Sequence, residues 1–178
     1  CSVLAQDEDL VEKLSDIAMK DALTGLPNRR YLENFLIYKL SECKHFHKPF
    51  ALLFVDVDDF TTFNNHYGHD VGDEILKNIS RSVQKEFRKA DLFGRWGGEE
   101  FIGICSIRKS KDAAIIAEKV RILVENTRVL TPQGQLSATI SVGVTVARPD
   151  DTLQSIVARA DQLMYESKRK GKNCTCCG

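Results

Sequence analysis

The feature that most constrains the fold is an apolar run that ends in a group of acidic residues. The β-branched and aromatic residues of the segment Phe50 to Val57 are typical of a buried strand. Asp56, Asp58 and Asp59 stand where this run ends. Because carboxylates are costly to bury without partners, their place at a strand end favours a functional site. A solvated acidic turn is the alternative, and this segment alone does not decide between the two.

The periodicity of apolar residues predicts the remaining elements. We expect helices over residues 8–19, 70–87, 110–126 and 152–169, and another whose apolar face carries Tyr31, Phe35, Leu36 and Leu40. Residues 60–67 are expected to form a short helix or turn closed by Gly68. Further strands are expected over residues 92–96, 101–105 and 136–147. The order strand, helix, strand, strand, helix, strand is that of a ferredoxin-like fold. We therefore expect an α/β (α+β) domain with a central, mostly antiparallel sheet flanked by helices.

A second acidic pair lies at a glycine turn. Gly97 and Gly98 precede Glu99 and Glu100 between two predicted strands, which indicates a tight hairpin. If this hairpin lies beside the first strand, its carboxylates converge with Asp56 and repel one another. A hard divalent cation such as Mg²⁺ would neutralise the cluster. Two acidic elements around metal are typical of two-metal phosphoryl or nucleotidyl transfer.

The segment from Gly97 to Phe101 resembles the signature of the GGDEF family of diguanylate cyclases, in its GGEEF form. The resemblance continues through Asp21 to Arg30, Asp56 to Asp58, Asn64, Gly68-His69, Gly72-Asp73, Ala160-Asp161, Tyr165, Lys168, Gly171 and Asn173. It covers about residues 19–173 and implies a palm-type nucleotidyl cyclase fold. The implied organisation is a signalling or linker helix in residues 1–20, a catalytic domain in 21–173 and a tail in 174–178.

The resemblance implies that the chain is a nucleotidyltransferase joining two GTP molecules into cyclic di-GMP and releasing two pyrophosphates. Asp56, Glu99 and Glu100 would be catalytic, and they would hold two Mg²⁺ or Mn²⁺ ions together with the backbone carbonyl of Val57. Glu100 would complete the metal site or help to activate the 3′-hydroxyl. Because each domain binds one GTP, the active form would be a homodimer.

The resemblance also implies how guanine is recognised. Asn64 and Asp73 occupy the positions that contact guanine, whose N1 and amine donors suit a carboxylate acceptor. Gly98 would lie under the guanosine, where a side chain would intrude. Taken alone, Asn64 and Asp73 would be ordinary surface or capping residues, and Gly98 a hairpin glycine.

Phosphate binding is implied at four positions. Lys168 and Lys172 match triphosphate-binding residues, although the second is more often Arg, and backbone amides at Phe60 and Thr61 can cradle phosphate oxygens. The family usually has Lys where this chain has Thr61, and Asp where it has Asn65. We expect these departures to tune binding rather than abolish it.

Arg88 and Asp91 have the spacing of the family's product-inhibition site, five residues before Gly97. There the resemblance implies that Arg binds cyclic di-GMP through guanine edges. As an isolated pair the two residues would form a surface salt bridge of little energetic value.

Composition limits the partners. Twenty-five basic residues balance 25 acidic ones, which argues against nucleic acid as a partner. No apolar run reaches the roughly 20 residues that span a bilayer. The chain begins with Cys1, and we expect a cytoplasmic piece of a longer protein, such as the output domain of a sensor, including a membrane-bound one.

Three functions compete: an active cyclase, a degenerate domain that senses cyclic di-GMP or binds GTP, and a protein-interaction module. The presence of Asp56, Glu99 and Glu100 favours the active cyclase. A cyclase using adenine nucleotides is the nearest rival, and Asp73 argues against it.

Overall fold

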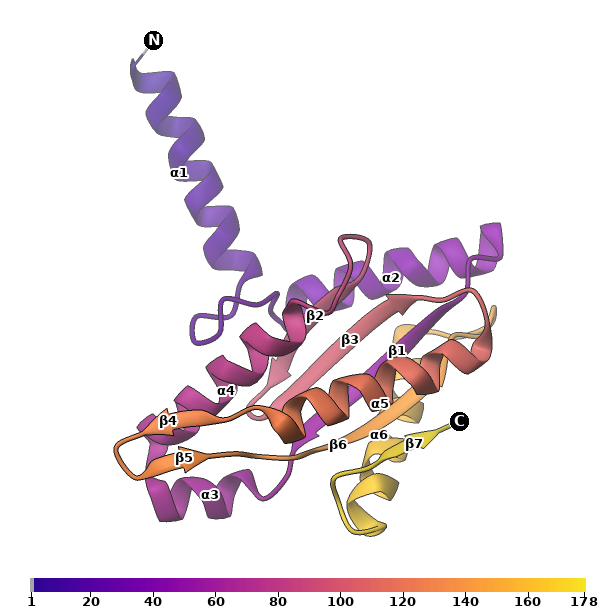
Figure 1. The fold of residues 1–178 in the computed structure, drawn as a ribbon. Coiled ribbons are helices and arrows are strands. Elements are labelled where there is room, and N and C mark those ends of the chain that lie inside the picture. Colours follow the sequence, from indigo (N-terminus) through magenta and orange to yellow (C-terminus); the bar gives the residue numbers. More distant parts are fainter. Residues whose placement is uncertain (1) are drawn as a thin grey trace.

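The computed structural model describes residues 2–178, and it describes the side chains of all of these except residues 2–6 and 9 (Figure 1). Cys1, which the sequence assigned to the N-terminal helix, lies outside the described residues. The helices are α1 (Ser2–Met19), α2 (Arg29–Phe46), α3 (Phe60–Tyr67), α4 (His69–Gln84), α5 (Ser110–Asn126) and α6 (Leu153–Arg169). The strands are β1 (Phe50–Val57), β2 (Leu92–Gly97), β3 (Glu100–Ser106), β4 (Val129–Thr131), β5 (Gly134–Leu136), β6 (Ile140–Val146) and β7 (Thr175–Cys177).

The main sheet has five strands in the order β2-β3-β1-β6-β7, and all its pairs are antiparallel except β6 with β7. Strand β1 lies in the middle of the sheet, between β3 and β6. The helical connections from β1 to β2 and from β3 to β6 therefore each pass over one intervening strand. This confirms the expected ferredoxin-like, mostly antiparallel sheet flanked by helices. Strands β4 and β5 form a separate hairpin.

Side chains of β1 alternate between two cores, because successive residues of a strand point to opposite faces. Leu53 and Val55 join the core beneath α4 and α5, whereas Leu52 and Phe54 join the core beneath α2 and α6. Both faces of β1 are therefore covered, which is why its sequence is an almost continuous apolar run. Asp56 falls on the α2 and α6 face by the same alternation.

Helix α6 begins at a reciprocal cap. Thr152 Oγ1 accepts a hydrogen bond from the backbone N–H of Ser155 at 3.1 Å, and Ser155 Oγ accepts one from the N–H of Thr152 at 2.9 Å. Such a capping box satisfies two backbone donors that the helix leaves without partners. The cap fixes the start of the helix that carries Lys168 at its other end.

The prediction of a single strand over residues 136–147 was wrong. Residues 137–139 interrupt it, so β5 and β6 are separate, and β5 pairs with the unexpected strand β4. Just before β6 begins, the side chain of Thr139 donates a hydrogen bond to Asp58 at 2.7 Å.

Two details of the predicted helices also differ. Tyr31 was expected on the apolar face of α2, but it is 38% exposed and the buried apolar face is formed by Leu32, Leu36 and Cys43. Helix α4 ends at Gln84 rather than at residue 87.

The C-terminal residues join the main sheet, whereas the N-terminal helix does not pack on it. Residues 174–178, expected to be a tail, contribute β7 to the sheet, where the N–H of Val142 donates to the carbonyl of Cys174 at 3.0 Å. Helix α1 projects away from the sheet (Figure 1), and it exposes Leu10, Leu14 and Ile17. Across the described part of the chain, the helices are too short or too polar to span a bilayer.

Candidate active site

The two acidic segments meet at one end of the sheet. Asp56 of β1 pairs directly with Glu100 of β3, and the N–H of Val57 donates to the carbonyl of Glu99 at 3.2 Å. Directly opposite residues of an antiparallel pair have neighbouring side chains on the same face. The β2–β3 hairpin that carries Glu99 and Glu100 therefore lies beside β1, and its carboxylates approach Asp56.

The electrostatics of this cluster disfavour negative charge. Burial raises the pKa of Asp56, and the nearby carboxylates of Glu99 and Asp58 raise it further. Burial likewise raises the pKa of Glu100, with added repulsion from Asp56 and from Asp161 of α6. Grouped carboxylates of this kind gain stability from a cation.

Lys168 is the cation that contacts the cluster in this structure. Its Nζ lies 2.6 Å from Asp56 Oδ1, 3.1 Å from Asp58 Oδ1 and 3.3 Å from the carbonyl oxygen of Val57. Burial lowers the pKa of Lys168, but the hydrogen bonds to Asp56 and Asp58 outweigh this and raise it overall. The residue expected to bind triphosphate is thus held on the carboxylates.

The donors match a hard divalent cation in their chemistry. Asp56, Glu99, Glu100 and the carbonyl of Val57 offer only oxygen, the ligand that Mg²⁺ and Mn²⁺ prefer. Asp56 and the carbonyl of Val57 already bind the ammonium group of Lys168. Within residues 2–178 as described, however, no three His, Cys, Asp or Glu side chains are arranged to hold an ion together. These oxygens could hold metal only after a local rearrangement that moves Lys168.

Asp58 has a different environment from Asp56. It is 7% exposed and accepts hydrogen bonds from Thr139 Oγ1 at 2.7 Å, Ser141 Oγ at 2.6 Å and the N–H of Asn173 at 2.9 Å. Although burial raises the pKa of Asp58, these hydrogen bonds lower it overall. Asp58 is thus the centre of a hydrogen-bond network that engages both of its carboxylate oxygens.

Asn64 and Asp73 lie on consecutive helices, α3 and α4. Asn64 Oδ1 is buried and accepts no hydrogen bond, which is rare for a buried carbonyl oxygen. Gly72 makes room for it, since a Cβ at position 72 would lie 1.7 Å from Asn64 Oδ1. Gly98 is exposed at the hairpin tip, and a Cβ there would meet nothing within 4 Å.

The predicted phosphate-binding positions lie around the start of α3. Phe60 and Thr61 are its first two residues, and Asp59 before them has a left-handed φ of 53°. Lys172 contacts the carboxylate of Asp59 and has a left-handed φ of 65°. These residues therefore lie together beside the carboxylate cluster.

Arg88 and Asp91 lie elsewhere. Arg88 Nε is 3.3 Å from Asp91 Oδ2, its Nη2 donates to the carbonyl of Ser106 at 2.9 Å, and Asp91 Oδ1 accepts from the N–H of Ser106 at 3.0 Å. Ser106 pairs with the first residue of β1, Phe50, whereas Asp56 is near the last. The pair is thus at the opposite end of β1 from the carboxylate cluster.

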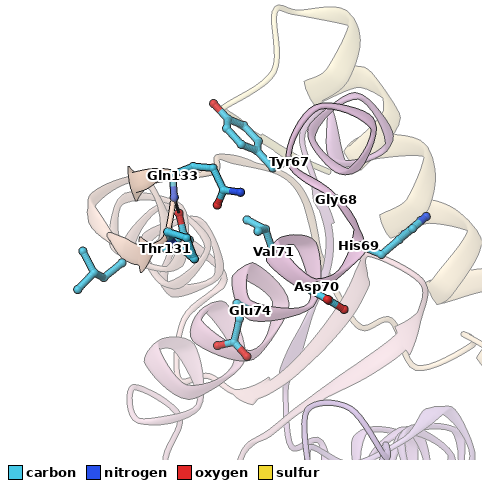
Figure 2. A pocket seen from close by; sticks show the side chains of 10 residues that line it. Tyr67, Gly68, His69, Asp70, Val71, Glu74, Thr131 and Gln133 are labelled. Atoms are coloured by element: carbon cyan, nitrogen blue, oxygen red, sulfur yellow. Dashed lines mark hydrogen bonds between the residues drawn. The ribbon is translucent and has the colours of Figure 1, made fainter.

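A cavity of about 450 Å³ opens between the α3–α4 junction and the β4–β5 hairpin (Figure 2). Tyr67, Val71 and Gln133 are among its lining residues, and it contains none of the site residues that the sequence predicted. A neighbouring cavity of about 390 Å³ reaches the site through Asp58 and Asp59. The nearby β4–β5 hairpin could not be inferred from sequence, because its strands are only three residues each.

Comparison with known proteins identifies the class. The family model described as "Diguanylate cyclase, GGDEF domain" matches residues 18–174. The chain belongs to this family.

Its relatives include the response regulator PleD of Caulobacter vibrioides, 36% identical over 161 residues, which are 89% of this chain and 36% of PleD. Among solved structures, the diguanylate cyclase SiaD of Pseudomonas aeruginosa, in complex with its activator SiaC, is 36% identical with a TM-score of 0.88 over 99% of this chain and 68% of that one. The GGDEF domain of DgcB from Caulobacter crescentus, in complex with c-di-GMP, is 27% identical with a TM-score of 0.85 over 90% of this chain and 95% of that one. The chain thus spans about a third of PleD.

Proposed function

We propose that this chain is an active diguanylate cyclase that condenses two GTP molecules into cyclic di-GMP and two pyrophosphates. The observation that carries this proposal is the direct pairing of Asp56 with Glu100, which gathers the family's acidic residues at one end of the sheet. A degenerate sensor would have no need for these acids, whose mutual repulsion costs stability. We further propose that residues 21–173 form the catalytic unit and act in the cytoplasm.

In the proposed mechanism, two divalent ions would be held by Asp56, the carbonyl of Val57, Glu99 and Glu100. Such ions would neutralise the charge that develops on the attacking and leaving oxygens. Lys168 would leave the carboxylates that it contacts and would bind the triphosphate. The exchange would keep positive charge at these oxygens, because the divalent ions would take the place of the single ammonium.

Guanine recognition would use Asn64 and Asp73. The buried Asn64 Oδ1 has no partner in the structure, so a donor from the base would satisfy it. Asp73 would accept from guanine N1 and its amine, and Gly98 would leave room for the nucleoside. Phe60 and Thr61 would offer backbone amides to phosphate, and Lys172 would add positive charge at this end of the site.

We propose that the active species is a homodimer. One chain supplies one pair of guanine readers, Asn64 and Asp73, whereas the product contains two guanosines. Each 3′-hydroxyl must reach the α-phosphate of the other nucleotide, so two domains would face each other. Cyclic di-GMP would bind separately at Arg88 and Asp91 and hold the domains apart.

The direct test is to incubate the purified protein with GTP and Mg²⁺ or Mn²⁺ and to identify the product by mass. We expect cyclic di-GMP from the parent and none from Asp56→Ala or Glu99→Ala, because each substitution removes an oxygen donor. Circular dichroism should show that both variants remain folded. Near-normal turnover by either variant would overturn the assignment of the acidic residues, and a parent without any dinucleotide product would overturn the proposed activity.

A further inference from the structure

The loop after α6 holds an unusual backbone conformation. Three consecutive residues, Gly171, Lys172 and Asn173, have positive φ angles of 119°, 65° and 45°. Glycine adopts such angles readily and asparagine tolerates them, but a lysine in this region is strained. A strained backbone persists only where surrounding contacts hold it. The contacts that hold residues 170–174 therefore bear on how Lys172 is placed.

Arg121 of α5 makes a side-chain contact to this loop through Asn173. Its Nη1 donates to Asn173 Oδ1 at 2.7 Å and to Glu125 Oε2 at 2.8 Å, while Asn173 Nδ2 donates to Glu125 Oε1 at 2.9 Å. The side-chain amide of Asn173 is thus hydrogen-bonded at both its Oδ1 and its Nδ2. On its other side Arg121 binds Glu118 through Nε and Nη2 at 2.7–3.0 Å, and Glu118 also accepts from Thr175 Oγ1 at 3.3 Å.

Asn173 connects this cluster to the proposed site. Its backbone N–H donates to Asp58 Oδ2 at 2.9 Å, and Asp58 Oδ1 accepts from Lys168 Nζ at 3.1 Å. A continuous hydrogen-bond path therefore runs from Arg121 on α5 to Lys168, and Lys172 directly precedes Asn173 in the chain. The side chain of Arg121 is only 13% exposed, so water cannot easily replace its contacts.

We propose that Arg121 is a positioning residue for GTP binding. Through Asn173 it holds residues 170–174 in the conformation that places Lys172, and through Asp58 it orients Lys168. The inference rests on the proposed function, since it assumes that both lysines bind the triphosphate. Arg121 itself does not contact the carboxylates that would hold metal, so its loss should weaken nucleotide binding more than the chemical step.

The test compares Arg121→Ala and Arg121→Lys with Arg128→Ala as a matched control. Arg128 is an exposed arginine just beyond the end of α5, and its described hydrogen bonds go to the backbone carbonyls of Glu125 and Thr127. Three quantities are measured: the amide hydrogen exchange of Asn173 without nucleotide, the affinity for a GTP analogue with a methylene bridge between its α- and β-phosphates, and kcat and KM with GTP.

For Arg121→Ala we expect faster exchange of the Asn173 amide, roughly tenfold weaker analogue binding and a similar rise in KM, with kcat within about threefold of the parent. Arg121→Lys should recover part of the affinity, because lysine keeps the charge but cannot reach all three partners in a fork. Arg128→Ala should resemble the parent in all three measurements.

Unchanged exchange at Asn173 or unchanged analogue binding in Arg121→Ala would overturn the inference. So would a loss of kcat without any rise in KM. If Arg121→Ala fails to fold, Arg121→Lys decides, since exchange and affinity equal to those of the parent would contradict a role for the fork. A parent that makes no cyclic di-GMP but shows the expected exchange and binding changes would overturn the proposed activity and leave the positioning role supported.

Discussion

At the residue scale, Asn64 and Gly72 can be understood only as a pair. A methyl group at position 72 would lie 1.7 Å from Asn64 Oδ1 and 2.8 Å from its Cγ, so Asn64 would have to move. We expect Gly72→Ala to raise the KM for GTP at least tenfold, because a displaced Asn64 cannot accept from the base. Asn78→Ala, on the same helix, is the control and should leave KM unchanged, because the described hydrogen bond of Asn78 goes only to the carbonyl of Glu74 at 2.8 Å. Equal KM values for Gly72→Ala and the parent would count against Asn64 as a guanine reader.

Glu100 makes stability depend on pH in a direction that can be stated. Its pKa is raised from the usual 4.5 by burial and by Asp56. A carboxyl with a raised folded-state pKa contributes stability below about pH 4.5, and this contribution is lost as pH rises through the folded-state pKa. In a chelating buffer, Glu100→Gln should therefore match the parent near pH 4 and be the more stable protein at pH 7.5.

Urea unfolding at the two pH values measures this difference. At pH 7.5 added Mg²⁺ should raise the unfolding midpoint of the parent more than that of Glu100→Gln, since bound metal stabilises the folded state by mass action. A parent that is more stable than Glu100→Gln at pH 7.5 without metal would contradict the assigned environment of Glu100.

At the element scale, the packing of α6 on β6 depends on Gly143. A Cβ at this position would lie 2.1 Å from the carbonyl oxygen of Ala160 and 2.3 Å from the nitrogen of Met164, both of which are backbone atoms of the helix. Gly143→Ala must therefore push α6 away from the sheet, and Lys168 with it. We expect a loss of about 3 kcal/mol in the free energy of unfolding, at the upper end of overpacking costs.

Gly103→Ala provides the matched comparison for Gly143→Ala. Its Cβ would lie 2.9 Å from Phe87, but the contact is with the outer end of a side chain that can turn aside. The loss in the free energy of unfolding should be smaller than for Gly143→Ala, and GTP turnover should be largely kept. If chemical denaturation shows equal losses for the two variants, the close approach of α6 is not the cause.

The sequence predicted those elements whose signal is local. The bounds of β1 and α3 agree with the prediction, because the apolar run of β1 is buried on both faces and Gly68 closes α3. The strands β4, β5 and β7 were missed, since three residues carry no periodicity and their pairing depends on tertiary structure. The convergence of Asp56 and Glu100 was predicted only on the condition that β1 and β3 are neighbours. Side-chain hydrogen bonds between distant residues, such as that of Arg121 with Asn173, 52 residues apart, could not be predicted because they produce no pattern in the sequence.

At the scale of the whole molecule, the proposed dimer makes activity depend on protein concentration. Because each domain binds one GTP in the proposed mechanism, the rate per chain should rise with concentration until the dimer is saturated. Turnover is measured over a dilution series alongside sizing chromatography. A rate per chain that stays constant at concentrations where only monomer is seen would contradict assembly across two domains.

Product inhibition is the other property that we propose for the assembly. Asp91 is a poor residue to mutate, because its side chain is 5% exposed and accepts from the backbone N–H groups of Arg88 and Ser106. The Arg88 side chain is 69% exposed and lies at the opposite end of β1 from Asp56, so it can be removed with less structural cost. We therefore expect Arg88→Ala to keep the initial rate.

Cyclic di-GMP should inhibit the parent without competing with GTP, since a ligand at Arg88 would hold two domains apart rather than occupy the substrate site. Losing a bidentate contact to guanine costs about 1–3 kcal/mol, so Arg88→Ala should need roughly tenfold more product for half inhibition. Lys89→Ala, the exposed neighbour, serves as the control because it removes the same charge without the fork. Initial rates at several product concentrations measure the shift. Equal inhibition of Arg88→Ala and the parent would mean that Arg88 and Asp91 form only a surface salt bridge.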